Sequence, residues 1–458
     1  MTSARNAAWS LGLALAATAA GVAVVVRPQL AVVMAIGAVI LGAYVMLGEL
    51  FWWDLFLLAI GGSLILVYGF ANIGLRSPTP IPLADLLAVV LLIRAVTTPG
   101  IRWRWSAPFV FAAVFLTIAC GRLAVDVPTW GTQAVRDFTL ALEVSFLPIG
   151  YWAMARYGLE RWKKALSWIF VICLAYFAFF PVSDQIGRFG PTVGLQRSVP
   201  LLGSFSGVST AAAAGFFFFA LIRPFGRLSY VLAAGFLAEL AVFQQRGIYL
   251  AIPVAAILVW ALAGSSGRAR TGLAAAFATG VIALALFLPL APEGRLGPVS
   301  PWFTVSQLRT LQGGAGPGSG SYQARVTWFH QVVDEVRARG TEGWLGGVGL
   351  GPDLIGNSHL RKPHNDYLEV FARLGLPALL IFVGMLLTAV NAVRVAARRA
   401  DSETSRFLWW IFAVAVVFIL IAATQPLLAF PYGTIPLFSL LGAGLALHDR
   451  VLRGRAVS

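Results

Sequence analysis

Apolar runs of about 20 residues, the length that a helix needs to cross a hydrocarbon core about 30 Å thick, recur along this chain from Ala8 to His448. Continuous blocks such as LAVVMAIGAVILGAYVML, at residues 30–47, lack the alternation that the strands of a membrane barrel have. Hydrophobic residues make up 59% of the 458 positions and charged residues 12%, a balance too apolar for a soluble domain. The sequence therefore predicts an all-α, polytopic transmembrane helix bundle.

The basic residues predict how the helices are threaded. With a cytoplasmic N-terminus and about 12 to 14 spans, the loops RWRW, RYGLERWKK, RPFGR, GRAR and RVAARR and the tail DRVLRGR all fall inside, as the positive-inside rule requires. The formal charge of +15 thus follows from topology, and we expect no nucleic-acid partner. The predicted spans are residues 8–26, 30–48, 51–70, 81–97, 107–122, 138–155, 165–183, 207–222, 229–244, 247–263, 272–290, 373–393, 407–424 and 432–447.

Cysteine use and the N-terminus narrow the reading further. Cys120 and Cys173 are the two cysteines, and both lie in or beside predicted spans, so neither a disulfide framework nor a thiolate metal site is expected. The first 26 residues are typical of a signal peptide, but a second apolar run follows at once. That favours an uncleaved first helix.

The longest interruption between spans is 291–372, which the topology places outside the membrane on the far side from the cytoplasm. The chain then divides into transmembrane helices at 1–290, a small helical extracytoplasmic lobe at 291–372, and C-terminal transmembrane helices with a cytoplasmic tail at 373–458. Within the lobe, GGAGPGSG has the composition of a flexible linker. The following SYQARVTWFHQVVDEVRARG predicts an amphipathic helix that carries Arg325 in its opening turn, with an apolar stripe of Val326, Phe329, Val332, Val333 and Val336.

A glycine-rich turn and a histidine follow this helix. GGVGLG, at 346–351, lacks the Lys-Ser/Thr of a P-loop, which favours a tight turn against a substrate or another helix over a nucleotide site. Next, in KPHNDYLEVFARLGLPALL, Asn365 is a good N-cap, Asp366 favours a helix N-terminus, and Gly375 ends the helix. His364 thus sits directly before a helix start, where partial positive charge keeps its ring neutral.

Two further stretches place arginines at the outer membrane face. The short turn FQQRGI holds Arg246 between two spans, and the loop at 184–207 holds Arg197. An arginine at membrane depth is costly unless it faces a polar cavity or an anionic partner. Glu239, two turns earlier on the same helix, offers Arg246 a purely structural partner. For Arg325 the structural alternative is an exposed position on the solvated face of its helix.

Arg246, Arg325 and His364 form the constellation that we expect to carry chemistry. Two guanidinium groups can hold a diphosphate through charge-assisted hydrogen bonds, and a neutral imidazole beside them can take a proton from an attacking hydroxyl. Together they predict a transferase that uses a lipid diphosphate donor. His359 lies five residues before His364, but this spacing matches no zinc pattern, so we expect no metal.

The same residues carry a family resemblance over about residues 240–395. The arginine before TWFHQVV, the GGVGLG turn, HNDYLEVFARLGLPALLIF running into a span, and the earlier QQRG together resemble the O-antigen ligase and O-antigen polymerase superfamily of bacterial membrane glycosyltransferases. The resemblance implies a GT-C-like architecture and an inverting, metal-independent transfer without cofactors. It implies His364 as the base and Arg246 and Arg325 as diphosphate ligands. Arg197 resembles an upstream loop arginine, although SFSGVST replaces the asparagine-containing run that often follows it.

The resemblance also implies partners and a location. The donor would be a glycan on undecaprenyl diphosphate, and the acceptor lipid A core or a growing glycan, at the periplasmic face of a bacterial inner membrane among its lipids. Ligation, polymerisation of repeat units and transfer to protein share this chemistry; we rank ligase and polymerase first. A lipid-linked glycan transporter and a passive scaffold are the alternatives without catalysis. Four motif residues are expected to support the site: Trp328, Asn365, Asp366 and Tyr367.

Overall fold

The computed structural model describes residues 48–75, 81–101, 103–179, 205–263, 267–287, 299–300, 302, 305–306, 309, 319–355 and 363–455. These residues are helical apart from turns, loops and two short strands, β1 (Gly74–Leu75) and β2 (Ile81–Pro82), which pair antiparallel. The prediction of an all-α bundle is therefore confirmed for this part of the chain. The first two predicted spans and Arg197 lie outside the described residues.

Five helical stretches among the described residues are long and apolar enough to cross a membrane. They are α6 (Ala107–Trp130), the consecutive α7 (Thr132–Glu143) and α8 (Phe146–Phe177), α17 (Asp366–Arg399), α18 (Ser402–Ala422) and α19 (Pro431–Arg455). Other helices occupy the remaining predicted spans of the described chain: α3 (Glu49–Ile65), α4 (Tyr68–Ala71), α5 (Leu83–Thr97), α10 (Phe205–Leu221), α11 (Leu228–Phe243), α12 (Arg246–Leu262) and α13 (Gly267–Phe287).

Glycines allow the backbones of α8 and α19 to approach closely. A Cβ on Gly150 would strike the backbone of Ser439, and a Cβ on Gly442 would strike the backbone of Leu147. Small residues let helix backbones approach in this way where lipid supplies no hydrophobic drive for helix association. Two other glycines bend helices: Gly158 breaks α8 and Gly375 breaks α17, each with positive φ.

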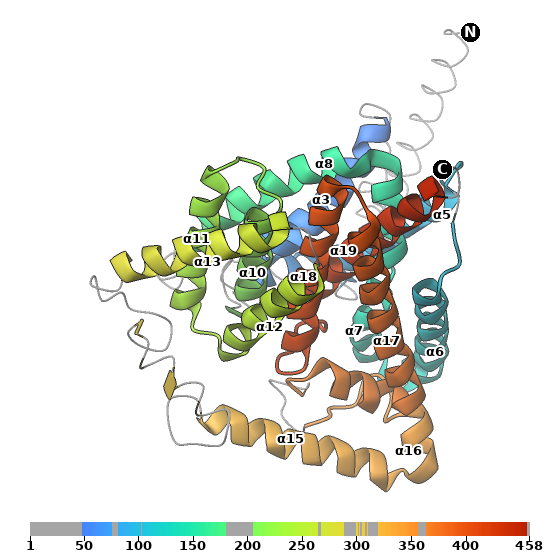
Figure 1. The fold of residues 1–458 in the computed structure, drawn as a ribbon. Coiled ribbons are helices and arrows are strands. Elements are labelled where there is room, and N and C mark those ends of the chain that lie inside the picture. The colour runs from blue at the N-terminus through green and yellow to red at the C-terminus, as the bar shows by residue number, and fades with distance from the viewer. Residues whose placement is uncertain are drawn as a thin grey trace, which may run out of the picture.

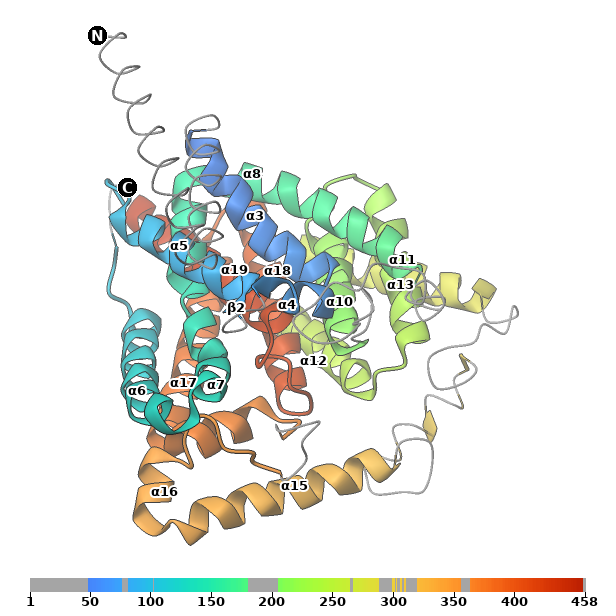
Figure 2. The same cartoon turned by 180° about the vertical axis from the view of Figure 1, so that it is seen from behind.

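The helices α15 (Ser319–Ala338) and α16 (Gly340–Gly346) form an arm across the end of the bundle where α17 begins, opposite the end where α19 finishes (Figure 1, Figure 2). Val332 and Val336 of the arm are buried against the first turns of α17. The predicted apolar stripe is wrong in its first half, because Val326 is 39% exposed and Phe329 49% exposed. Trp328 packs instead against the buried residues between the arm and the first turns of α17.

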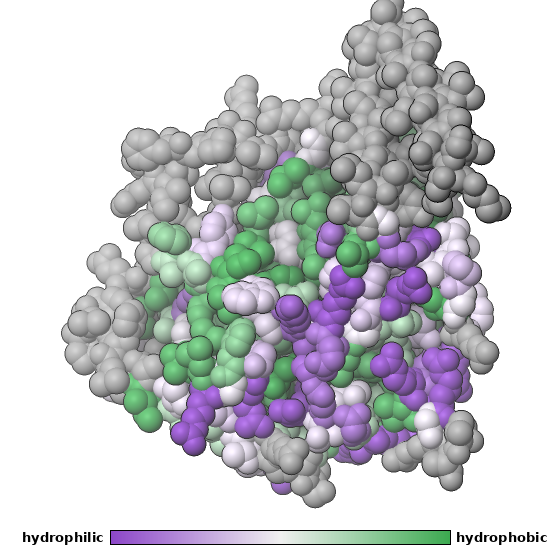
Figure 3. Space-filling view, turned by 90° about the horizontal axis from the view of Figure 1, so that it is seen from above, coloured by the Kyte–Doolittle hydropathy of each residue, from purple (hydrophilic) through white to green (hydrophobic). Residues whose placement is uncertain are grey.

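On the face of the bundle opposite the arm, hydrophilic side chains gather over one part and hydrophobic side chains over another (Figure 3). Ion pairs that join helix ends include Arg94 of α5 with Glu49 of α3, at 2.5 Å, and Lys163 of α8 with Glu403 of α18. Exposed pairs of this kind contribute little to stability.

Candidate functional site

The glycine-rich turn at 346–351 is the platform on which the arm rests. Asp126 of α6 accepts the Leu350 N–H at 2.6 Å, and Asp137 of α7 accepts the Gly351 N–H at 2.9 Å. Gly349 has φ 102°, and a Cβ there would strike Arg122, which pairs with Asp126 at 2.7 Å. Since carboxylates already occupy these N–H groups, the turn binds neighbouring helices, in line with the tight-turn interpretation.

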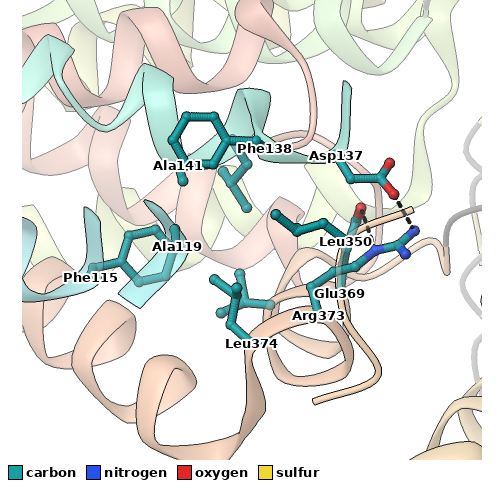
Figure 4. A pocket seen from close by; sticks show the side chains of 11 residues that line it. Phe115, Ala119, Asp137, Phe138, Ala141, Leu350, Glu369, Arg373 and Leu374 are labelled. Atoms are coloured by element: carbon teal, nitrogen blue, oxygen red, sulfur yellow. Dashed lines mark ion pairs between the residues drawn. The ribbon is translucent and has the colours of Figure 1, made fainter. Parts of the chain in front are cut away.

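Arg373 locks the same turn from α17. Its Nη1 donates to the carbonyl oxygens of Pro352 at 2.7 Å and Gly349 at 3.2 Å, while Nη2 lies 3.1 Å from Asp137 Oδ2 and Nε 4.0 Å from Glu369 Oε1 (Figure 4). The cavity beside this group is about 20 Å³, which has room for about one water and none for a sugar. Arg373 is therefore a structural arginine, and removing either partner of its buried pair would leave an uncompensated charge.

The first turn of α17 is held by two side chains with different jobs. Asn365 is the N-cap, as predicted, and accepts the Leu368 N–H at 3.0 Å. Asp366 is fully buried, and its two carboxylate oxygens accept the N–H groups of Leu428, at 2.6 Å, and Ala429, at 3.0 Å. Besides favouring the helix start, Asp366 thus fixes the connection between α18 and α19 beside it.

Tyr367 ties the same helix start to α18. Its hydroxyl donates to the carbonyl oxygen of Ile419 at 2.9 Å, one turn before α18 ends. The end of α18 also meets α12, because a Cβ on Gly247 would contact Ile421 and Thr424. The starts of α12 and α17 therefore flank the last turn of α18 and the connection that follows it.

His364 lies directly before this helix start, under the arm. The Trp328 ring of α15 stacks on the imidazole with 5.0 Å between ring centroids and 28° between planes. Burial, and then the positive charge of Arg325, lower the pKa of His364 from 6.5 to about 4. The ring is therefore neutral at pH 7, as predicted. The partial positive charge at the start of α17, from which this was predicted, is not the main cause.

Arg325 lies in the second turn of α15 and faces a second cation. Burial, and then the charge of Arg246, lower the pKa of the Arg325 guanidinium. Its Nε is buried and has no hydrogen-bond partner among the described residues. The alternative of a solvated helix face does not fit this placement. Two half-buried cations within electrostatic reach of one another favour an anion between them.

Arg246 begins α12, and two residues, Gln244 and Gln245, separate it from the end of α11. The prediction that Glu239 lies on the same helix as Arg246 is therefore wrong. The structural partner considered for it does not engage it. Glu239 belongs to α11, and neither of its carboxylate oxygens has a hydrogen-bond partner within the described chain. Gln244 lies between the two residues and ends α11 in the left-handed conformation, with φ 50°.

The structure brings Arg246, Arg325, His364 and Trp328 into one neighbourhood, although they come from α12, α15 and the segment before α17. Arg197 and His359 lie outside the described residues. In the described ranges no group of three or more His, Cys, Asp or Glu residues is placed to hold a metal ion.

Sequence reasoning missed the residues that fix the platform: Asp126, Asp137 and Arg373. One signal was available, because a carboxylate or guanidinium inside an apolar helix is costly and so needs a partner. The sequence could not name the partners, which lie more than 200 residues apart for Asp126 and Asp137 against the turn. A comparison with protein-family models gives no match for this chain, and a comparison with curated proteins gives none either.

Proposed function

We propose that this protein is a membrane glycosyltransferase that moves a glycan from undecaprenyl diphosphate to an acceptor hydroxyl, of the O-antigen ligase type with lipid A core as acceptor. One observation supports it above all. The charge of Arg246 lowers the pKa of Arg325, and the charge of Arg325 lowers the pKa of His364, which is neutral at pH 7. Two cations beside an uncharged base are what displacement of a diphosphate requires.

The reaction that we propose balances without a metal or cofactor. The acceptor oxygen attacks the anomeric carbon, and its proton passes to the His364 ring. The bond from the anomeric carbon to the phosphate oxygen breaks, and the electron pair stays on that oxygen. Arg246 and Arg325 stabilise the diphosphate that departs, which is the largest charge change in the step.

The low basicity of His364 fits this scheme once the donor is bound. A proton acceptor with a pKa of about 4 is weak at neutral pH. A bound diphosphate would offset the charge of Arg325, one of the two causes of the lowering, and so raise the pKa of His364. Binding of the donor would then strengthen the base that takes the proton from the acceptor.

The location follows from the same proposal. Undecaprenyl diphosphate needs a lateral approach from lipid, and we infer that the arm lies on the periplasmic face of a bacterial inner membrane. The face opposite the arm then faces the cytoplasm, the side on which the positive-inside rule places the basic loops. The predicted lobe and the GT-C-like architecture belong to this proposal.

The test is transfer by purified protein. Protein in lipid nanodiscs receives an undecaprenyl-diphosphate glycan, with and without lipid A core, and products are separated by size. A core-linked glycan supports the ligase, longer lipid-linked chains would mean a polymerase, and unchanged donor would overturn both. EDTA should leave the rate unchanged.

A matched pair of variants tests the base. His364→Ala should abolish transfer while the protein still binds undecaprenyl diphosphate, because the arginines remain. His330→Ala removes an exposed histidine from α15, and this variant should transfer glycan normally. A transporter of lipid-linked glycan would not need an imidazole at position 364. If His364→Ala moved the lipid-linked glycan as well as the wild-type protein does, that result would favour the transporter.

A further inference from the structure

The turn between α11 and α12 holds a buried amide that the proposed reaction has not used. Gln245 is the N-cap residue of α12, yet its side chain caps no backbone N–H. The side chain is 2% exposed, and neither its Nε2 nor its Oε1 has a hydrogen-bond partner among the described residues. A fully buried and unsatisfied glutamine is uncommon in a folded protein and calls for an explanation.

Stability does not explain this glutamine. Burying an amide without partners costs free energy, and an apolar side chain of similar size would avoid that cost. The neighbouring backbone does not use the amide either, because the Gln245 carbonyl, not its side chain, accepts the Ile248 N–H at 3.1 Å. The amide is therefore a group whose partner is a water or a ligand.

The position of the amide indicates which ligand. Gln245 directly precedes Arg246, at the N-terminus of a 17-residue helix whose dipole places partial positive charge there. Arg325, close enough to be affected by the charge of Arg246, has a buried Nε that also lacks a partner in the described chain. Two buried donors without acceptors are thus both linked to Arg246, Gln245 through the chain and Arg325 through its charge, which fits a ligand rich in acceptor oxygens.

The charge of the donor substrate indicates what a neutral amide can add. A glycosyl diphosphate joined to a lipid carries about two negative charges, which the two guanidinium groups balance. Breaking the glycosidic bond adds a further negative charge to the phosphate oxygen that departs. A third cation would meet repulsion from two that already disfavour one another, whereas an amide N–H stabilises the new charge without that repulsion.

We propose that the Gln245 side-chain amide donates a hydrogen bond to the phosphate oxygen that receives the electron pair when the glycosidic bond breaks. This inference rests on the proposed glycosyl transfer and adds a third ligand of the leaving group. Since the charge exists fully only after bond breaking, the amide binds the transition state and the product more strongly than the donor substrate.

Gln245→Leu tests this directly, because leucine is similar in size and cannot donate. We expect kcat to fall about 100-fold, as when a preorganised oxyanion donor is removed, with little change in KM for the glycan donor. The melting temperature should stay the same or rise, because an unsatisfied buried amide has been removed. Affinity for free undecaprenyl diphosphate should fall more than affinity for undecaprenyl monophosphate.

Two further variants complete the design. Gln245→Glu should lose more activity than Gln245→Leu, because a carboxylate would repel the departing phosphate. Ser439→Ala is the control: its hydroxyl is also fully buried and without a partner in the described residues, but it lies in α19 against α8. It should keep wild-type kcat and stability.

The outcomes separate this inference from the function on which it rests. Wild-type protein that neither binds undecaprenyl diphosphate nor transfers glycan would overturn both. Active wild-type protein with an equally active Gln245→Leu variant would overturn the role of the amide alone. A Gln245→Leu variant whose melting temperature falls together with its activity would show that the glutamine is structural, and that too would overturn the proposal.

Discussion

Asp366→Asn tests whether one buried carboxylate holds the connection between α18 and α19 in place. The carboxylate accepts two backbone N–H groups from that connection, Leu428 at 2.6 Å and Ala429 at 3.0 Å. Asparagine keeps one acceptor oxygen and turns an NH₂ group toward the other N–H. One charge-assisted hydrogen bond is therefore lost, the other becomes neutral, and a buried N–H is left without a partner.

The size of the effect follows from these contacts. A hydrogen bond to a charged group contributes about 1.5–3 kcal/mol, and a buried N–H without an acceptor carries a desolvation penalty of similar size. A local cost of about 3 kcal/mol is a conservative sum, since the weaker bond that remains offsets part of the loss. At about 1.4 kcal/mol per factor of ten, the connection should open about 100-fold more often.

Hydrogen–deuterium exchange of the peptide covering residues 425–430 measures this opening. Exchange should accelerate about 100-fold in Asp366→Asn, while peptides of α8 and α19 stay protected. Asp401→Asn is the matched control, because Asp401 Oδ1 also accepts two N–H groups, from Glu403 and Thr404, but at the exposed start of α18. Unchanged exchange at 425–430 in Asp366→Asn would refute the reasoning.

Three further predictions address the site and its platform. Arg325→Lys should lose at least 10-fold in transfer, because an ammonium cannot form the paired grip, whereas Arg337→Lys, on an exposed position of the same helix, should not; equal rates for both variants would contradict the grip. As pH falls, kcat/KM should decrease only below about 4, the pKa of His364 in the free protein, because protonation removes the base. The decrease in kcat should occur at higher pH, because bound diphosphate offsets the charge of Arg325 and raises the pKa of His364. If both parameters decreased at the same pH, the proposed effect of diphosphate on His364 would be wrong. Gly349→Ala should lower the free energy of unfolding by about 2–3 kcal/mol, because a Cβ at φ 102° is strained and strikes Arg122. Gly340→Ala, with open space around it, should lower it by about 1 kcal/mol. Melting temperatures in detergent measure both changes, and equal decreases for the two variants would contradict a fixed turn.

Much of the local structure was predictable because it depends on nearby residues. The span expected at 107–122 is the first two thirds of α6. The span expected at 373–393 falls within α17, and the span expected at 407–424 falls within α18 except for its last two residues. Asn365 caps its helix, and Gly375 interrupts it with positive φ. Hydropathy, capping and glycine conformations act over a few residues, so the sequence carries them directly.

The amphipathic arm marks where this local reasoning fails. Helical periodicity predicted the helix but not its buried face, because Trp328, and not Val326 or Phe329, packs against the buried residues at the start of α17. The cause of the low pKa of His364 was mistaken for a similar reason. The helix end was visible in the sequence, whereas burial beneath Trp328 and the charge of Arg325 depend on how α15 folds back.

The sequence by itself determined that this chain is a helical membrane protein and named the arginines and the histidine on which its proposed chemistry depends. Only the tertiary structure decided that Arg246 and Arg325 lie within electrostatic reach of one another, that Asp366 fixes the α18 to α19 connection, and that Gln245 is buried without a partner. The physical reason is distance along the chain. Hydropathy and helix capping depend on adjacent residues, but desolvation and charge interactions depend on which distant segments the fold brings together.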